Sequence, residues 1–317
     1  MARWWAPSGT LASMRIATWN VNSLKARQEA VDNWLHRAAP DILLMQETKL
    51  TDDDAPVMAF AMNGYQLVHH GEGRWNGVAI AAKDGLTVSD VVTNFGDGPV
   101  RDSGPGATGG DATEDDFDPF DEARMVAATV DGVRVVSLYA PNGRVVDSPF
   151  YAGKLAWFER LARWVHDELA GGAGGTGGAL ILGGDLNVAP TPRDVWNETA
   201  VHGGTHVSEP ERAAFRALLD AGLVDGYRER HDEAGRFSWW DYRAGNFHKN
   251  FGMRIDHLLL APPVAARVVD AEIDREARKG PPVPSDHAPL SVDLDELGAP
   301  IDPDWEGALA RIKSRSR

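Results

Sequence analysis

The stretch LILGGDLNVAP, residues 180–190, joins an apolar run typical of a buried strand to polar side chains directly behind it. Asp185 ends the run, and Asn187 follows two residues later. The chain repeats this construction with an acidic residue at three other places: Glu47 after ILLMQ, Asp256 in RIDHLLL and Asp286 in SDHAPL. Several acids at the ends of buried strands indicate one shared site.

Composition narrows the class of protein. With 317 residues and 43% hydrophobic content, the chain can bury a large core. It has no run of eighteen apolar residues, so we expect no membrane partner. The N-terminal segment MARWWAPSGTLAS lacks the apolar stretch of a secretory signal, and the absence of cysteine fits a reducing interior, so we expect a cytoplasmic location. The net charge of −15 argues against a surface that coats nucleic acid, but allows a local basic groove.

Apolar periodicity predicts alternating strands and helices. Several strands follow one another in hairpin succession, which favours an α/β protein with mixed sheets over a purely parallel one. A helix capped by Ser23 is stopped by Pro40, and two others are expected at 149–169 and 209–220. The expected strands are 14–20, 41–46, 65–70, 77–83, 86–92, 125–130, 133–139, the strand ending at Asp185, 254–260, 266–273 and 287–293.

We expect one catalytic domain, 14–297, between an N-terminal extension, 1–13, and a C-terminal tail, 298–317. Nine acids and one arginine lie between Asp97 and Glu122, in a stretch without apolar periodicity. This acidic loop, 97–122, is at its length either functional or disordered, and its run GPGATGGDATEDD, 104–116, lacks the apolar residues to pack, so we expect that run to be disordered and outside the core. The segment GGAGGTGG, 171–178, is typical of a flexible connector.

The polar residues at strand ends have the composition of a metal site. Crowded carboxylates repel and raise one another's pKa unless a cation neutralises them. A set rich in Asp, Glu and Asn, with one His and no Cys, suits Mg²⁺, or Mn²⁺ in its place, better than Zn²⁺. The eight residues are Asn20, Glu47, Tyr139, Asp185, Asn187, Asp256, Asp286 and His287.

Some of these residues also fit ordinary structural interpretations. Asp185 and Asn187 fit an Asx-turn, and Asp256 fits an ion pair with Arg254. Tyr139 taken alone fits an ordinary strand aromatic. Taken together, these interpretations require the same coincidence many times, so we favour a functional site.

Seven motifs in order give the chain a family resemblance. The chain resembles exodeoxyribonuclease III, the bacterial abasic-site endonuclease group of the endonuclease/exonuclease/phosphatase superfamily. The resemblance covers the chain from Met14 to Leu294. The motifs are WNVN (19–22), QETK (46–49), YAPNGR (139–144), GDLNVAP (184–190), FSWWDYR (237–243), RIDHLLLA (254–261) and SDHAP (285–289).

The resemblance implies a fold and an activity. The fold would be a four-layer sandwich of two mixed β-sheets packed face to face, with helices outside. The activity would be Mg²⁺-dependent cleavage of duplex DNA on the 5′ side of abasic sites, with 3′-to-5′ exonuclease and 3′-end-cleaning activity. We expect a monomer whose partner is duplex DNA with abasic sites or 3′ ends. The alternatives are a phosphodiesterase or phosphatase of the same superfamily acting on inositol phosphates or phospholipids, or a catalytically silent DNA-binding protein.

The resemblance also implies roles for individual residues. Asp185 would orient or deprotonate the attacking water, and Asn187 would hold the phosphate. His287 would bind a phosphate oxygen, oriented by Asp286 or Asp256, and Tyr139 would bond the phosphate or act as an acid near the leaving group. The identity of the general base stays open. The implied metal site, with Glu47 as principal ligand, comprises Asn20, Glu47, Asp185, Asn187, Asp286 and His287.

DNA recognition would involve two further groups of residues. Trp239, Met253 and Ile255 would wall a pocket that admits a flipped-out baseless sugar and excludes a nucleotide by size. Asn142 and Arg144 lie on a loop after Tyr139 and suit contacts to phosphate. The structural alternatives are core positions for the first group and a surface charge for Arg144.

Overall fold

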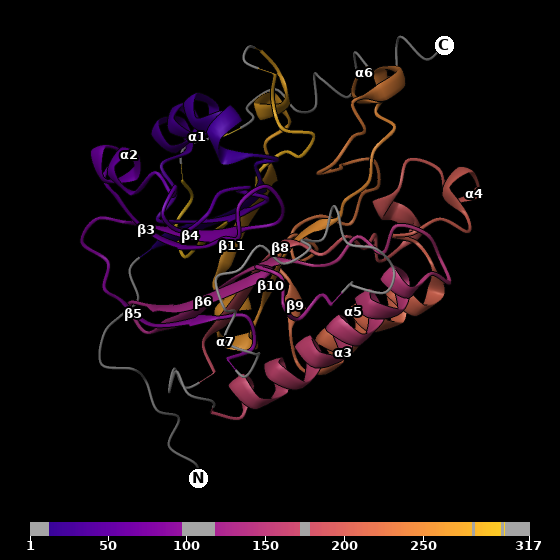
Figure 1. The fold of residues 1–317 in the computed structure, drawn as a ribbon, viewed down its shortest axis with the longest axis horizontal. Helices are drawn as coiled ribbons and strands as arrows, with labels where there is room; N and C mark the ends of the chain where they lie inside the picture. The colour runs from indigo at the N-terminus through magenta and orange to yellow at the C-terminus, as the bar shows by residue number, and fades with distance from the viewer. Residues whose placement is uncertain (1–12, 97–117, 172–177, 281–282, 299–300, 302–317) are drawn as a thin grey trace.

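The computed structural model describes residues 13–96, 118–171, 178–280, 283–298 and 301. Two six-stranded sheets form the centre of the molecule (Figure 1). The strands are β1 (Met14–Asn20), β2 (Ile42–Gln46), β3 (Tyr65–His70), β4 (Val78–Lys83), β5 (Val88–Thr93), β6 (Met125–Val130), β7 (Val133–Tyr139), β8 (Leu180–Asp185), β9 (Val224–Asp225), β10 (Asp256–Leu260), β11 (Val268–Ile273) and β12 (Leu290–Leu294).

Each sheet is mixed. The first has the order β11-β12-β1-β2-β4-β3 and the second the order β5-β6-β7-β8-β10-β9. β1 and β2 are parallel in the first sheet, and β7 and β8 are parallel in the second, whereas the other pairs are antiparallel. The carboxyl ends of these four strands carry four of the polar residues singled out in the sequence: Asn20, Glu47, Tyr139 and Asp185.

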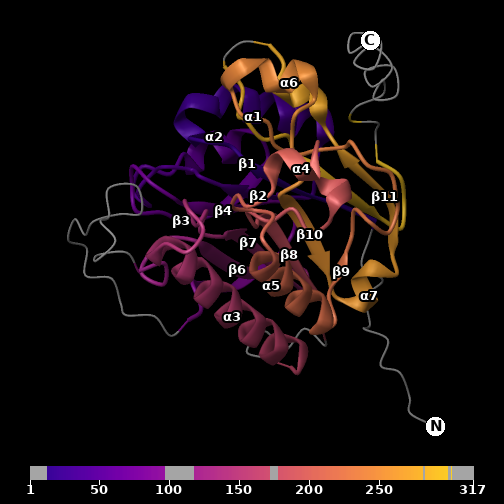
Figure 2. The ribbon, with the colours of Figure 1, turned by 90° about the vertical axis from the view of Figure 1, so that its right-hand side faces the viewer.

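Helices cover the outer face of each sheet (Figure 2). α1 (Leu24–Ala38) and α2 (Val57–Met62) pack on the first sheet, while α3 (Pro149–Leu169) and α5 (Glu209–Asp220) pack on the second. The predicted α/β four-layer sandwich is therefore confirmed. The shorter helices are α4 (Glu198–Val201), α6 (Asn246–Lys249) and α7 (Pro262–Ala265), with 3-10 turns at Pro192–Asp194, Arg243–Gly245 and Arg275–Arg278.

The central strands are apolar on both faces because each lies between two layers. In β2, Ile42 and Leu44 face the other sheet, whereas Leu43 and Met45 face the helices. This double burial explains why ILLM and LIL lack the polar alternation of a strand with one wet face.

Gly183 of LILGGD lets the opposite sheet approach closely two residues before Asp185. A Cβ on Gly183 would lie 2.4 Å from Leu44 Cδ1 of the opposite sheet. A polar bridge crosses the same region, because Ser137 Oγ donates to Met45 O at 2.8 Å and accepts from Gln46 Nε2 at 3.0 Å. Both features hold the strand ends at a fixed separation.

The predicted long elements are found, with some shifts at their ends. The strands predicted from 254, 266 and 287 begin at Asp256, Val268 and Leu290, because α7 and the extended segments before β10 and β12 take the earlier residues. The four-residue helices, α2 and β9 were not predicted.

Several predictions concern parts of the chain outside the described residues. These are residues 1–12 of the extension, 97–117 of the acidic loop, 172–177 of the glycine-rich connector and most of the tail. Ile301 of the tail is described and packs on the cluster beneath α1. In the described ranges, no helix combines the length and apolar content needed to span a bilayer.

Candidate functional site

Five strand ends from both sheets meet at one edge of the sandwich. Asp185 at the end of β8 lies beside Tyr139 at the end of β7 and opposite Asp256 at the start of β10. In the other sheet, Asn20 ends β1 and Glu47 directly follows β2. These side chains converge in the structure, as the positions of the strand ends in the sequence predicted.

Asn20 links the acids of the two sheets. Its amide nitrogen donates to Glu47 Oε1 at 2.8 Å and to Asp185 Oδ2 at 3.0 Å. Its oxygen accepts the main-chain N–H of Asn22 at 3.0 Å. Since a carboxylate only accepts hydrogen bonds, the amide must present nitrogen to the acids. Asn20 thus bridges the carboxylates, and its oxygen is turned away from them.

Glu47 is held as a carboxylate. Lys49 Nζ lies 2.8 Å from its Oε2. Burial alone would raise the pKa of Glu47, but Lys49 and Asn20 outweigh burial and lower it.

His287 lies between two carboxylates. Its Nδ1 bonds Asp256 Oδ2 at 2.8 Å, and its Nε2 lies 3.7 Å from Asp185 Oδ2. Burial lowers the pKa of His287, but Asp256 and Asp185 outweigh this and raise it to about 10. The ring is therefore an imidazolium at neutral pH. Of the two predicted partners that could orient His287, the structure has Asp256 and not Asp286 on its ring.

Asp185 has the electrostatics of a proton acceptor. Burial raises its pKa to about 7; Asp256 and Glu47 add to the rise, while His287 opposes it. A carboxyl group with this pKa can take and release a proton near neutral pH. Tyr139 differs, because burial and Glu47 raise its pKa well above the usual value and keep it a neutral phenol.

Three of the predicted metal ligands form a compact group. Ligand atoms of Glu47, Asp185 and His287 all lie within 4.8 Å of one another. The two carboxylates can hold a divalent cation, whereas the His287 imidazolium, protonated on both nitrogens, has no lone pair to offer one. Asp286 lies outside this group, since its two oxygens accept from Asn22 Nδ2 at 2.9 Å and Trp239 Nε1 at 3.1 Å.

The loop after β8 is both a turn and part of the site. Asn187 N donates to Asp185 Oδ1 at 2.9 Å, which is the Asx-turn that the sequence allowed. The Asn187 amide donates to Ala140 O at 3.0 Å and accepts from Asn142 Nδ2 at 3.4 Å, so the two loops are joined. The Asx-turn is therefore present, and the same turn places Asp185 in the group with Glu47 and His287.

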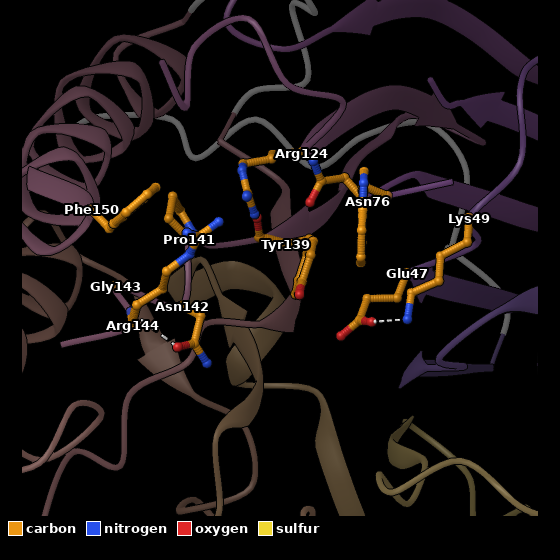
Figure 3. Close-up of a pocket in the computed structure, with 11 residues that line it drawn as sticks. Glu47, Lys49, Asn76, Arg124, Tyr139, Pro141, Asn142, Gly143, Arg144 and Phe150 are labelled. Carbon is orange, nitrogen blue, oxygen red and sulfur yellow. Dashed lines mark hydrogen bonds and ion pairs between the residues drawn. The ribbon is translucent and has the colours of Figure 1, made fainter. Parts of the chain in front are cut away.

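A cavity of about 320 Å³ opens beside Tyr139 (Figure 3). Figure 3 shows the Tyr139 hydroxyl and the Glu47 carboxylate directed into the same space. The lining includes three cations, Lys49, Arg124 and Arg144, and the aromatic rings of Trp75 and Phe150. Asn142 also lines it. The cations suit contacts to backbone phosphates, and the aromatic rings suit contacts to an attached base or sugar.

The three predicted pocket residues lie together beside His287, with which Trp239 forms an isolated β-bridge. Trp239 and Met253 are partly buried and exchange main-chain hydrogen bonds at 2.9 and 3.0 Å. Ile255 is 2% exposed and packs in the same apolar cluster. The first two can face a ligand, whereas Ile255 supports them from the core.

Sequence analysis missed several residues around the site. Lys154 of α3 is fully buried; its ammonium ion pairs with Glu211 and donates to Asn187 O at 2.7 Å. His206 Nδ1 donates to the same carbonyl at 2.6 Å, and its ring lies 6.5 Å from that of Trp239. The pattern SEPE at 208–211 signals the capping box of α5, but these contacts depend on tertiary packing.

The model of the endonuclease/exonuclease/phosphatase family matches residues 17–287. The chain belongs to this family. Among its relatives in the family is exodeoxyribonuclease III of Haemophilus influenzae, 28% identical over 296 residues, which cover 87% of this chain and 98% of that protein.

Two solved structures of the family are similar over most of the chain. One is a 3′ phosphatase from Neisseria, NExo, bound to a product DNA hairpin: 38% identity, TM-score 0.77, covering 89% of this chain and 100% of that one. The other is an AP endonuclease from Archaeoglobus fulgidus: 33% identity, TM-score 0.76, with the same coverage of both chains. The predicted family and fold are therefore confirmed, and these relatives support a DNA-repair nuclease.

Proposed function

We propose that the protein is a DNA-repair phosphodiesterase that uses a divalent cation to cleave duplex DNA 5′ of abasic sites and to clean 3′ ends. One observation carries the proposal: an acid with a pKa of about 7, Asp185, lies 3.7 Å from the His287 imidazolium and within reach of Glu47. Asp185 supplies a proton acceptor and His287 supplies positive charge beside it, and phosphodiester hydrolysis requires both.

The carboxylates of Glu47 and Asp185 fit a hard divalent cation, and we propose Mg²⁺, with Mn²⁺ as substitute, while the His287 imidazolium lies beside them. When bound, the cation would supply positive charge to the phosphate oxygens. Asn20 holds the two carboxylates together, and Asp286 positions Asn22 and Trp239 nearby.

The remaining steps belong to the side chains. Asp185 accepts the proton of the attacking water, which its pKa allows near neutral pH. His287 stabilises the negative charge on the phosphate, with Asp256 holding its Nδ1. Tyr139, as a neutral phenol, donates a hydrogen bond to the phosphate or the leaving oxygen. The Asn187 amide has a second N–H for a phosphate oxygen.

We assign DNA contacts to two groups of residues around this centre. Asn142 and Arg144 line the cationic cavity and would bind the DNA backbone. Trp239 and Met253, backed by Ile255, would contact the exposed sugar of an abasic site. A monomeric state and a cytoplasmic location stay predictions.

A substrate panel tests the proposal. Three duplexes of one sequence carry an abasic site, a 3′ phosphate at a nick, or no damage, and an inositol phosphate represents the alternative substrates. We expect Mg²⁺-dependent cleavage of the abasic duplex, and a drop of roughly a hundredfold or more for Asp185→Asn. Hydrolysis of the inositol phosphate alone would contradict a DNA substrate.

The 3′ phosphatase relative from Neisseria favours a second candidate, in which 3′-phosphate removal is the main activity. Faster release of phosphate from the nicked duplex than cleavage of the abasic duplex would support it. Trp239→Ala should lower the preference for abasic over intact DNA without weakening cation binding. Unchanged preference in a folded variant would return Trp239 to a purely structural role.

A further inference from the structure

The turn that carries Glu47 into the site has an unusual backbone. Glu47 and Lys49 have φ angles of 52° and 54°, in the left-handed region that residues with side chains rarely adopt. Such angles persist only where the surroundings fix them. Main-chain bonds provide part of this, since Thr48 N donates to Gly77 O at 3.1 Å and Lys49 N to Asn76 O at 3.0 Å.

The residue between them, Thr48, is fixed by a chain of side chains. Thr48 Oγ1 lies 2.8 Å from His69 Nε2, and His69 Nδ1 lies 2.8 Å from Asp52 Oδ1. Because a carboxylate only accepts, the ring carries its proton on Nδ1 and the Thr48 hydroxyl donates to Nε2. Asp52 Oδ1 also accepts from Gly71 N at 2.8 Å, which anchors the outer end.

The chain of side chains fits closely. Thr48 is 0% exposed, and a Cβ on Gly77 would lie 2.2 Å from its Oγ1. A Cβ on Gly71 would lie 2.3 Å from His69 Cε1. Burial lowers the pKa of His69 although Asp52 opposes this, so the ring is neutral near pH 7. The arrangement therefore leaves Thr48 little freedom to rotate.

We propose that Asp52, His69 and Thr48 form a positioning relay that fixes the Glu47 turn and thereby places the Glu47 carboxylate for the cation. The proposal rests on the proposed function, in which Glu47 is a ligand. None of the three residues lines the cavity beside Tyr139. They act through Glu47 and are positioning residues.

Residues that orient a metal ligand typically change metal affinity by roughly ten- to a hundredfold when mutated. The relay reaches Glu47 through the main chain, so we expect the lower end of this range, about tenfold. The readout is the dissociation constant for Mn²⁺, measured by calorimetry on the metal-free full chain without DNA.

The sharpest comparison is between two substitutions of Thr48. Thr48→Val keeps the shape and removes the hydroxyl, and should raise the Kd for Mn²⁺ about tenfold. Thr48→Ser keeps the hydroxyl and should stay close to the wild type. Thr129→Val is a matched control, because the Thr129 hydroxyl is buried and has no hydrogen-bond partner among the described residues. It should leave the Kd unchanged.

Two further variants separate the relay from general destabilisation. His69→Phe should raise the Kd for Mn²⁺ as much as Thr48→Val does. Combining the two substitutions should raise the Kd little further, because each of them already removes the hydrogen bond between Thr48 and His69. Asp52→Ala removes a half-exposed side chain and should fold, while raising the Kd by a few fold. Thermal melts in EDTA verify that each variant is folded.

Two outcomes would overturn the relay and are distinguishable. If Glu47→Gln loses Mn²⁺ affinity while Thr48→Val, His69→Phe and Asp52→Ala bind as the wild type does, the relay is wrong and the proposed metal site stands. If the wild type does not bind Mn²⁺, or Glu47→Gln binds it equally well, the metal role of Glu47 is wrong and the relay falls with it.

Discussion

Asp256 and Asp185 of the second sheet flank the imidazole of His287, and their negative charge raises its pKa. Asp256 is fully buried, and its Oδ2 bonds the ring at 2.8 Å. Its Oδ1 has no hydrogen-bond partner among the described residues. The negative charge of Asp256 therefore stabilises the charged form of His287.

We therefore predict that Asp256→Asn lowers kcat by roughly a hundredfold, with little change in the affinity for DNA. The substitution keeps the shape and removes the charge that raises the His287 pKa. In the metal-free protein, the His287 pKa should fall from about 10 toward the ordinary value of 6.5. Single-turnover kinetics and an NMR titration of the ring measure both effects. A kcat within a few fold of the wild type would argue against this role.

Single residues also show where sequence reasoning stops. The pairing of Asp256 with His287 rather than with Arg254 depends on β10 and the SDHAP segment meeting in space. The family resemblance left Asp286 and Asp256 as equal candidates for orienting His287. Only the fold distinguishes them.

The start of β10 is anchored by a buried ion-pair cluster. Arg254 bonds Asp194 Oδ1 at 2.7 Å and Asp225 Oδ2 at 2.7 Å, which ties β10 to β9 and to the 3-10 turn at Pro192–Asp194. Arg254 is 1% exposed. This cluster fixes the place at which Asp256 enters the site two residues later.

The cluster predicts an acid-dependent stability. Burial raises the pKa values of Asp194 and Asp225, but Arg254 outweighs burial and lowers them, to about 2 for Asp194 and further for Asp225. An unfolded aspartate has a pKa near 3.9. The folded values are lower, so the stabilisation is present above about pH 4 and is lost as the pH falls toward about 2.

Asp225→Asn should lower the free energy of unfolding by about 3–5 kcal/mol at pH 7, because Arg254 loses a buried partner. The difference from the wild type should shrink as the pH falls below about 4, because the unfolded wild-type carboxylate takes up a proton there while the folded one is still ionised. Urea unfolding at several pH values measures this. A difference that is absent at pH 7, or constant with pH, would refute the account of the cluster.

Elements were predictable in proportion to their length. α3 and α5 have apolar stripes over many residues, and their predicted bounds match. α4, α6, α7 and β9 have two to four residues each, too few for a period to be recognised. Strand pairing could not be predicted from the sequence, because strands buried on both faces lack the alternation of apolar and polar residues that would show which face is which.

The whole molecule carries a net charge of −15 and still has a cationic cavity at the site. Lys49, Arg124 and Arg144 face this space, so binding of a phosphate chain would be local and not a property of the entire surface. Composition excluded a general basic coat, but it could not locate this cavity. Its lining comes from chain segments far apart in the sequence, among them the loops after β2 and β7.

The central claim is that the two sheets bring buried acids together so that a divalent cation can bind between them. Single-turnover cleavage of an end-labelled abasic duplex, in EDTA and after addition of excess Mg²⁺, tests it most directly. The account predicts no cleavage in EDTA, full recovery with Mg²⁺, and a loss of roughly a hundredfold or more in Asp185→Asn under the same conditions. Cleavage at the wild-type rate in EDTA would contradict it.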